Sequence, residues 1–355
     1  MRVLINAMHT SGGGGLVYLN GILPHVPRDW ELLISPDMAS KITVPEGMAV
    51  RVTPKLGFFG KHVYEQFVLP ILQRRWGFDA MLCNANYGPL FARRLVPIVH
   101  TTPRAAGAAK TLKMRLYWSF LVLLTKMSLA RAWRVLVVAE HVLADYGGKN
   151  LMNKAVVAHP GKPEWDKNTP FKKDEQLLLA VGDVYAQKNY PTLVQAVVRL
   201  RRERPDVRLV IVGRPVDAAA VRALDKAVEA HQAEGFVEVR GGVPHDDLLA
   251  LMAQAAVLVS VSRAECFNLP LLEALTVGTP VVCGDDDFFT EVVGTSAAVR
   301  LGLCEGAVAD AVAVAIFALL ESKPLCDQLI RAGYVRAGLF DWRLTGQKIT
   351  YTFAV

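Results

Sequence analysis

The chain has 355 residues, of which 52% are hydrophobic and 21% charged, so it is globular rather than disordered and long enough for two domains. Its net charge is +7, but residues 1–170 hold 21 Lys and Arg against 10 Asp and Glu, whereas residues 171–355 hold 19 against 23. The five cysteines are scattered and form no C-x-x-C pair, which favours reduced packing residues over disulfides or a zinc site. The first residues enter a strand pattern without a signal-peptide core, so we expect a cytoplasmic protein.

Short apolar runs alternate with helical or loop segments through the first half of the chain. This alternation predicts a parallel sheet covered on both faces, whose ligands bind at the carboxyl ends of the strands. Two features lie at such ends. A Gly-rich loop that includes Gly13 and Gly14 precedes a helix expected from about Leu16, and His100 ends a later strand. The predicted strands are residues 2–7, 30–35, 49–53, 79–83, 97–100, 135–139 and 154–158.

Both features have an ordinary structural alternative. A Gly-rich turn allows the backbone to approach a ligand, but it also occurs as a plain tight turn. A solitary histidine such as His100 is more often a hydrogen-bonding residue of the scaffold than a catalytic group.

The segment between Asp79 and Glu140 contains no acidic residue and is rich in basic and aromatic side chains. Its uncharged run, residues 116–125, is too short for the roughly 20 residues that span a bilayer. A basic helix with Trp, Tyr and Phe suits the surface of an anionic membrane, although a helix whose apolar face packs inward remains an alternative. No nucleic-acid-binding module accompanies the charge. We therefore expect the Arg104–Arg134 region to contact an anionic membrane surface and expect no nucleic-acid partner. The basic residues are Arg93, Arg94, Arg104, Lys110, Lys113, Arg115, Lys126, Arg131 and Arg134.

A stretch rich in Pro and charge at residues 159–171 reads as a linker, and we place the domain boundary near residue 162. Strands are expected at residues 176–181, 208–212 and 237–240, with helices at residues 246–255 and 308–320. The first of these two helices is expected to be capped by Asp246 or His245. Lys188 lies in a loop where a strand gives way to a helix. Asp285 and Asp287 are interpreted as a polar turn rather than a metal-binding pair.

The most informative stretch is residues 256–282, which read as a buried strand, a short loop and a helix from Pro270 to Val277. The start of such a helix offers free N–H groups near Asn268 and Leu269 and the positive end of the helix dipole, which suit a phosphate. Glu265 lies in the loop and Glu273 in the expected first turn. Either glutamate alone would serve as a helix cap, but together they suit the hydroxyls of a sugar and a ribose.

The spacing Glu265-x7-Glu273, within S-x-x-E-x-F-x-L-P-x-x-E-A-x-x-x-G-x-P-V-V, resembles the donor-site signature of family 4 retaining nucleotide-sugar glycosyltransferases. The resemblance implies an α/β protein of the GT-B fold, with two Rossmann-like doubly wound domains facing a central crevice. Residues 1–162 would form the acceptor-side domain and residues 163–342 the donor-binding domain. The segment 343–355, after the aromatic marker Phe340-Asp341-Trp342, would pack back on the first domain.

The resemblance also implies roles for individual residues. Lys188 would neutralise the leaving diphosphate, Glu265 would hold the sugar, and Glu273 would hold the ribose. Two positions depart from the family pattern: Thr101 stands where an Asp usually follows the histidine, and Asp183 stands where an Arg is common. The implied catalytic residues are Glu265, His100 and Lys188. The implied donor-binding residues are Gly13, Gly14, Lys188, Val243, Phe267, Asn268, Leu269 and Glu273.

These readings predict a retaining, metal-independent glycosyltransferase without a cofactor, in which the leaving phosphate takes the acceptor's proton. The basic first half favours a lipid-linked saccharide acceptor in surface polysaccharide or lipopolysaccharide assembly, and a location on the inner face of the cytoplasmic membrane. Soluble acceptors remain open. So do a catalytically weak nucleotide-sugar-binding subunit, for which Asp183 is the main argument, and a GT-B nucleotide-sugar epimerase.

Overall fold

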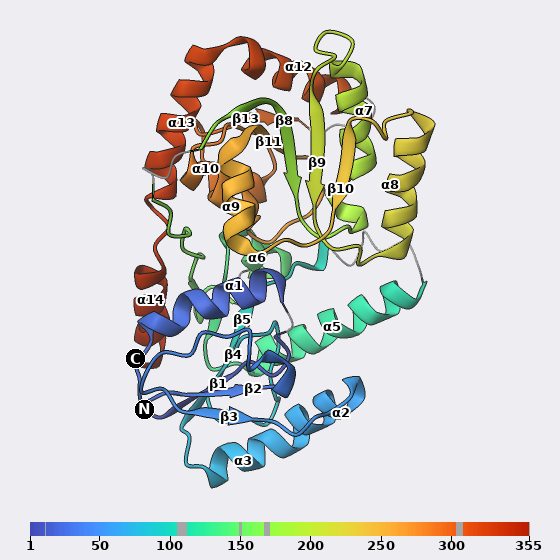
Figure 1. Ribbon diagram of the computed structural model, residues 1–355. Helices are drawn as coiled ribbons and strands as arrows, with labels where there is room; N and C mark the ends of the chain where they lie inside the picture. The colour runs from blue at the N-terminus through green and yellow to red at the C-terminus, as the bar shows by residue number, and fades with distance from the viewer. Residues whose placement is uncertain (11, 105–111, 149–150, 167–170, 303–307, 355) are drawn as a thin grey trace. The chain divides into compact units, whose positions relative to one another are not determined.

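The computed structural model describes residues 1–10, 12–104, 112–148, 151–166, 171–302 and 308–354, and it divides into two compact units (Figure 1). The first unit runs from the N-terminus to Gly161 and takes in the C-terminal segment from Phe340 onward. The second runs from Lys162 to Leu339. The sequence placed the boundary near residue 162 and the return to the first domain at residue 343.

The described residues of the first unit form a seven-stranded parallel sheet in the order β3-β2-β1-β4-β5-β6-β7. Its central strands are apolar and fully buried, as a parallel sheet covered on both faces requires, whereas the edge strand β3 is mostly exposed. The predicted strands are all present; most are somewhat shorter, whereas β5 begins two residues earlier than predicted and ends before His100. They are β1 (Val3–Asn6), β2 (Glu31–Ile34), β3 (Val50–Val52), β4 (Ala80–Cys83), β5 (Leu95–Val99), β6 (Val135–Val137) and β7 (Ala155–Val157).

The helices of the first unit include one correction to the sequence prediction. Helix α1 begins at Gly13 rather than near Leu16, so Gly13 and Gly14 lie in its first turn. Gly12 and Gly13 have φ values of 145° and 58°, which only glycine adopts readily, where the chain turns into the helix. The helical segments are α1 (Gly13–Ile22), η1 (Leu23–His25), η2 (Pro36–Met38), α2 (Phe58–Val63), the π-helical turn η3 (Tyr64–Val68), α3 (Leu69–Arg75), α5 (Leu112–Arg131), α6 (Glu140–Asp145) and α14 (Trp342–Ala354).

The described residues of the second unit form a six-stranded parallel sheet in the order β10-β9-β8-β11-β12-β13. The sequence analysis missed β13, a short strand with only half-buried side chains and Arg300 at its centre. The strands are β8 (Asp174–Val181), β9 (Arg208–Val212), β10 (Val237–Arg240), β11 (Ala255–Ser260), β12 (Val281–Gly284) and β13 (Val299–Leu301).

Two details of the second unit's helices differ from the prediction. Helix α9 follows Pro244 and has no side-chain cap, so capping by Asp246 or His245 was wrong. Helix α10 begins at Leu269, one residue early, which moves Glu273 from the first turn to the second. The helices are η5 (Ala186–Lys188), α7 (Tyr190–Leu200), α8 (Ala218–Ala230), α9 (His245–Gln254), α10 (Leu269–Val277), α11 (Asp287–Val293), α12 (Val308–Glu321) and α13 (Lys323–Ala337).

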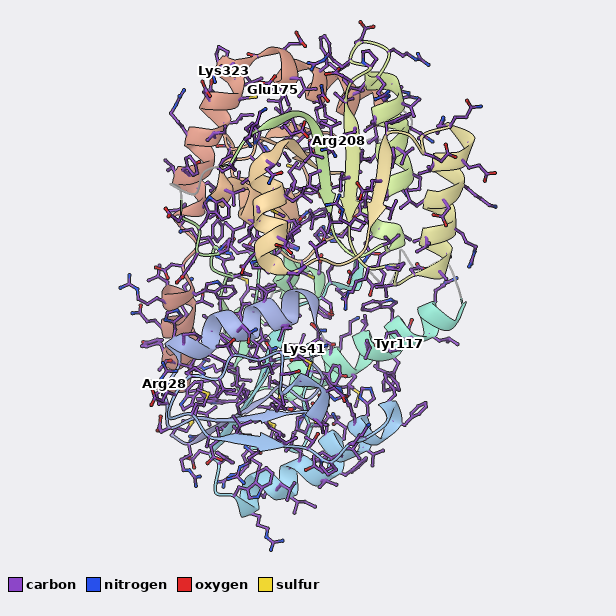
Figure 2. All side chains as sticks on the ribbon, in the orientation of Figure 1. Arg28, Lys41, Tyr117, Glu175, Arg208 and Lys323 are labelled. Carbon is purple, nitrogen blue, oxygen red and sulfur yellow. The ribbon has the colours of Figure 1, made fainter. Side chains whose placement is uncertain are left out.

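Within the described residues, no helix combines the length and apolarity needed to cross a membrane. Helix α5 packs on the first unit through a buried stripe that includes Leu124, Ser128 and Leu129, and its Ser128 hydroxyl donates to the Gly88 carbonyl. Its opposite side carries exposed apolar residues, among them Tyr117 (Figure 2).

The C-terminal helix α14 is fixed to the first unit by Trp342. The indole ring lies edge-on to Tyr18 at 5.5 Å and covers the α carbons of Gly21 and Gly161 so closely that a methyl group on either would overlap it. The Thr345 hydroxyl donates to the His159 carbonyl at 2.6 Å. The last helix is therefore part of the first unit.

We expect Gly21→Ala to destabilise the protein by about 1–3 kcal/mol, because the new methyl group must displace the Trp342 ring. Gly15→Ala, in the same helix but with open space around the position, is the matched control and should be neutral or slightly stabilising. Urea unfolding measures both differences. Equal stability of the two variants would contradict the packing described.

Candidate donor site in the second unit

The site is built at one edge of the second unit's sheet. Strands β9, β8 and β11 are neighbours and run parallel, so the loops that follow them emerge side by side. The loop after β8 carries Gly182 and Asp183, the loop after β9 carries Gly213 and Arg214, and the loop after β11 carries Glu265. Several charged side chains therefore meet where ligands of such sheets bind.

Lys188 and Glu265, separated by 77 residues in sequence, form an ion pair. Lys188 Nζ lies 2.6 Å from Glu265 Oε1, and the two side chains are only 12% and 14% exposed. The lysine side chain passes over Gly182, where a Cβ atom would lie 2.5 Å from Lys188 Cε. Gly182 also has a φ of 144°, which favours glycine. The glycine thus provides the space that brings the ammonium group to the carboxylate.

Asp183, at the position where the family commonly has Arg, is paired with Arg214. Arg214 Nε and Nη2 lie 3.1 and 2.6 Å from the two Asp183 oxygens, and the Arg214 amide donates to Oδ1 at 3.0 Å. Burial acts to raise the pKa of Asp183, but the hydrogen bonds from Arg214 outweigh it and the pKa lies below its ordinary value. The sequence analysis missed Arg214, although it follows a strand and a glycine.

The start of helix α10 retains hydrogen-bonding capacity. The N-cap residue Asn268 makes no side-chain capping hydrogen bond, and Glu273 lies beyond the first turn. Asn268 adopts a left-handed conformation, with φ 56° and ψ 62°, and its Nδ2 donates to the Ser260 hydroxyl at 3.1 Å. Its Oδ1 is buried and has no hydrogen-bond partner among the described residues. The first N–H groups of a helix have no partner inside it, so those at Asn268 and Leu269 suit an anionic ligand.

Glu273 is buried on the inner side of α10, and its side chain is 7% exposed. Burial raises its pKa to about 7. The nearest basic group is His245 Nδ1 at 3.9 Å, too far for a hydrogen bond, and burial lowers the pKa of His245. Among the residues that the structure describes, no donor forms a hydrogen bond to this carboxyl group, so it is well suited to accept hydrogen bonds from hydroxyl groups.

Two further predicted residues line the same part of the second unit. Val243 is half-buried in the loop between β10 and α9, next to Gly242, whose α carbon faces the Arg214 side chain. Phe267 is buried in the loop between Glu265 and α10. The sequence motif therefore folds into a local cluster around the strand ends.

The remaining predicted residues, His100, Gly13 and Gly14, belong to the first unit. His100 follows β5, and its Nε2 lies 3.1 Å from Asn84 Oδ1, while Asn84 Nδ2 donates to the Gly15 carbonyl at 3.0 Å. Burial lowers the pKa of His100 to about 4, so its ring is neutral at pH 7. Asn84, which the sequence analysis did not single out, links the histidine to the start of α1.

Glu273 should make stability depend on pH. Its pKa rises from an ordinary value of 4.5 in the unfolded chain to about 7 in the folded protein, so ionisation destabilises the fold increasingly as pH rises through this interval. Glu273→Gln removes this penalty. We expect it to add on the order of 3 kcal/mol at most to the free energy of unfolding at pH 8, and much less at pH 5.

Urea unfolding at pH 5 and pH 8 provides the comparison, with the exposed Glu229→Gln as the control. A Glu273→Gln difference that is the same at both pH values would show that the carboxyl is not buried as described.

Comparisons with known proteins agree with this architecture. Residues 161–336 match the family model described as "Glycosyl transferases group 1". O-antigen chain mannosyltransferase B of Escherichia coli is 32% identical over 165 residues, 46% of this chain and 42% of that protein. A phosphatidyl-myo-inositol mannosyltransferase of Mycolicibacterium smegmatis is 31% identical over 170 residues, 46% of this chain and 40% of that protein. These alignments thus span less than half of either relative.

Solved structures resemble the whole chain. Anabaena Alr3699/HepE in complex with UDP and glucose has a TM-score of 0.76 at 18% identity and covers 100% of this chain and 99% of its own. WaaG, a glycosyltransferase involved in lipopolysaccharide biosynthesis, has a TM-score of 0.74 at 14% identity and covers 99% of this chain and 98% of its own. The chain therefore has the GT-B fold, and its residues 161–336 are similar to the family described as "Glycosyl transferases group 1".

Proposed function

We propose that the protein transfers a sugar from a nucleotide-diphosphate donor to a saccharide acceptor, with retention of the anomeric configuration and without a metal or other cofactor. The observation that carries the proposal is the cluster at one sheet edge: the cations Lys188 and Arg214, three carboxyl groups and the start of α10. This combination matches the chemistry of a sugar joined to a ribose through a diphosphate.

The cations and the helix start would hold the diphosphate. Lys188 and the amides of Asn268 and Leu269 would stabilise the charge that builds on the leaving phosphate. Arg214, half exposed and aligned by Asp183, would supply the guanidinium that the family commonly has at position 183. The pairing of Asp183 with Arg214 supports the enzyme over the catalytically weak subunit, because it brings a guanidinium beside the position where the family commonly has Arg.

The carboxylates would position the sugar and the nucleoside. Donor phosphate would compete with Glu265 for the Lys188 ammonium, which frees Glu265 to accept hydrogen bonds from the sugar hydroxyls. Glu273 would accept those of the ribose, beside a base bordered by Val243. The acceptor oxygen would form the new bond to the anomeric carbon as the bond from that carbon to the phosphate oxygen breaks, so no nucleophile of the protein takes part. The departing phosphate would accept the proton of the acceptor hydroxyl, so no base of the protein takes part either.

The class of substrate is proposed from the relatives and the fold neighbours. The curated relatives named above are mannosyltransferases, one for O-antigen chains and one for phosphatidyl-myo-inositol, and the HepE structure holds UDP and glucose. By analogy we propose a hexose donor, and an acceptor in surface polysaccharide or lipopolysaccharide assembly.

A surface of the first unit supports a lipid-linked acceptor and attachment to the inner face of the cytoplasmic membrane. We call it the apolar face. It consists of exposed residues at helical spacing on two segments, residues 58–71 and helix α5. The segments meet where the ring centroids of Phe58 and Tyr117 lie 6.0 Å apart. It is formed by Phe58, Phe59, Val63, Phe67 and Ile71 from α2 to α3, and by Leu116, Tyr117, Phe120, Leu123 and Met127 of α5.

The basic residues around this face contribute unequally. Lys126 and Arg115 on α5 are exposed and suit anionic headgroups. Arg104 instead forms an ion pair with Asp145 at 2.8 Å, and Arg94 and Arg134 stack on Trp133. Lys110 lies outside the described residues. The proposed membrane surface therefore has fewer basic residues available for headgroups, and more exposed apolar residues, than the sequence indicated.

Substitution of Glu273 should affect donor binding, whereas substitution of Glu265 should affect the rate of transfer. The donor is first identified by screening UDP-, GDP- and dTDP-sugars for thermal stabilisation of the protein. A ligand at 100 times its dissociation constant adds roughly 2.7 kcal/mol to the free energy of unfolding. With that donor, Glu273→Ala should weaken donor binding, because the ribose hydroxyls lose the carboxylate that accepts their hydrogen bonds. Glu265→Ala should mainly slow transfer, because the sugar loses the hydrogen bonds that orient it for reaction. Calorimetric titration and a transfer assay with and without EDTA measure these effects.

Glu229→Ala, on the exposed side of α8, serves as the control. Two glutamate variants as active as the parent would refute the assigned roles, and loss of transfer in EDTA would refute metal independence. Binding without transfer would favour the nucleotide-sugar-binding subunit. Conversion of the donor without any acceptor would favour an epimerase.

Membrane attachment should depend on the apolar face. Phe59→Asp and Phe67→Asp place a charge where the side chains are 80% and 63% exposed, so neither should unfold the protein, but both should reduce sedimentation with phosphatidylglycerol vesicles. Val335→Asp, at a 74% exposed position on α13, is the matched control. Vesicle binding that is the same for all three variants would argue against this surface.

A further inference from the structure

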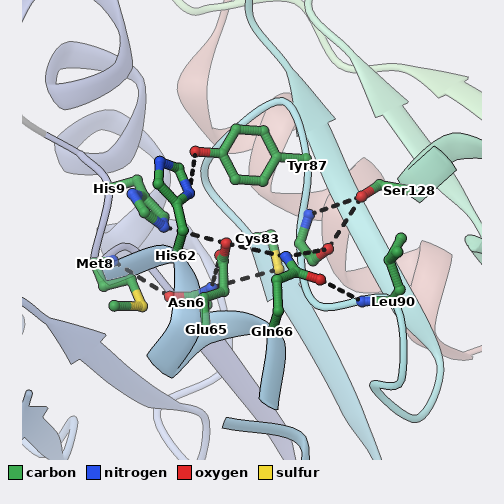
Figure 3. Close-up of polar contacts among 11 residues, drawn as sticks. Asn6, Met8, His9, His62, Glu65, Gln66, Cys83, Tyr87, Leu90 and Ser128 are labelled. Carbon is green, nitrogen blue, oxygen red and sulfur yellow. Dashed lines mark hydrogen bonds and ion pairs between the residues drawn. The ribbon is translucent and has the colours of Figure 1, made fainter. Parts of the chain in front are cut away.

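A second polar cluster lies in the first unit, apart from every residue assigned above. It joins His9, just after β1, to His62 on α2 and Glu65 on η3 (Figure 3). Asn6 at the end of β1 and Tyr87 after β4 complete it. The cluster therefore gathers titratable groups at the carboxyl end of β1, an edge where parallel sheets bind ligands.

Glu65 is the buried centre of this cluster, with a side-chain exposure of 0%. Its Oε1 accepts from Asn6 Nδ2 at 2.8 Å, and its Oε2 lies 3.1 Å from His9 Nε2 and 3.4 Å from Gln66 Nε2. The amide nitrogens of Asn6 and Gln66 donate to the two oxygens of this side chain. A carboxylate only accepts hydrogen bonds, so we assign the proton that bridges Glu65 and His9 to His9 Nε2.

This bond fixes the tautomer of His9. With the proton on Nε2, the neutral imidazole presents Nδ1 as a hydrogen-bond acceptor. The His9 side chain is 13% exposed, and its Nδ1 bonds to no residue in the part of the chain that the structure describes. Stacking on His62, with ring centroids 4.8 Å apart and planes at 23°, holds the ring in place. His9 is thus a pre-oriented acceptor close to the surface.

His62 connects the polar cluster to the apolar face. Its ring lies 4.8 Å from Phe58 and 5.9 Å from Phe120, while Tyr87 OH lies 3.5 Å from its Nδ1. Polar groups and a lipid-compatible surface therefore adjoin within one unit. A molecule with a hydroxyl-bearing head and an apolar tail would satisfy both.

We infer that His9, oriented by Glu65, binds a hydroxyl group of an amphiphilic saccharide acceptor, which donates its hydrogen bond to His9 Nδ1 while its lipid lies along the apolar face. The inference rests on the proposed transferase function and adds the acceptor site to it. Glu65 and Asn6 act through His9 as positioning residues. The hydroxyl bound by His9 is a neighbour of the reacting hydroxyl, because the single proton of the reacting hydroxyl passes to the departing phosphate in the proposed scheme.

A metal ion is a less fitting occupant of the cluster. The candidate ligand atoms of His9, His62 and Glu65 lie within 4.8 Å of one another, and the His9 nitrogen among them already bonds to Glu65. Nearly parallel stacked imidazoles also cannot both direct a nitrogen at one ion. The measurements below include metal content for this reason.

The tautomer of His9 gives a test that needs no substrate. In ¹⁵N-labelled protein at pH 8.5, with the signals assigned by their loss in His9→Asn, we expect a proton on Nε2 and none on Nδ1. Glu65→Gln should reverse this, because the amide oxygen remains with Asn6 and the amide nitrogen then donates to His9 Nε2. A parent protein with the proton on Nδ1 would overturn the inference, as would a stoichiometric metal ion lost in His62→Asn.

Transfer kinetics test the bound hydroxyl, with n-octyl β-D-glucopyranoside and n-octyl α-D-mannopyranoside as acceptor probes below their micelle concentrations. His9→Asn and Glu65→Gln should raise the acceptor KM roughly tenfold or more, the loss of about one hydrogen bond, with an unchanged donor dissociation constant. His231→Asn, at an exposed position in the second unit, is the control.

Different results would overturn the transferase function and the acceptor site at His9. A parent protein that binds no nucleotide sugar would overturn the transferase function itself. A parent that binds the donor, but whose His9 signals and transfer rate respond to neither octyl glycoside, would overturn only the acceptor site. Variants with an unaltered acceptor KM would do the same.

Discussion

The contact between Lys188 and Glu265 is the interaction on which the proposed donor chemistry depends. Its 2.6 Å distance is possible because Gly182 has no side chain beneath the lysine. The largely buried charges would be costly alone, so each needs the other while the site is free of donor. Arg214 and Asp183 repeat this arrangement on the neighbouring loop. Without a donor, Lys188 and Arg214 are therefore each paired with a carboxylate, and we propose that the donor phosphates replace Glu265 and Asp183 as their partners.

The two units carry different groups at the carboxyl ends of their strands. In the second unit, cations and a helix start converge on strand ends, which suits a diphosphate. In the first unit, a buried carboxylate orients a histidine beside an apolar surface, which suits a hydroxyl and a lipid. The same βα architecture serves both, because the strand ends carry different side chains.

Much of the fold was predictable from local pattern. Apolar runs such as Val3–Asn6 form strands, and Pro270 and Gly278 delimit α10 to within a residue. The motif around Glu265 correctly predicted a buried strand, a loop and a helix in succession. Pairings between distant loops were not predictable: Arg214 with Asp183, or Glu65 with His9, arise from the order of strands in space rather than from sequence spacing. Burial of Glu273 and its raised pKa likewise depend on packing.

A crystal structure of the protein with its best-binding nucleotide sugar tests the central claim most directly. The account predicts that the diphosphate lies against the amides of Asn268 and Leu269, with Lys188 Nζ moved from Glu265 to a phosphate oxygen and Glu273 bonded to the ribose. A nucleotide bound elsewhere in the second unit, with the Lys188–Glu265 pair intact, would contradict it.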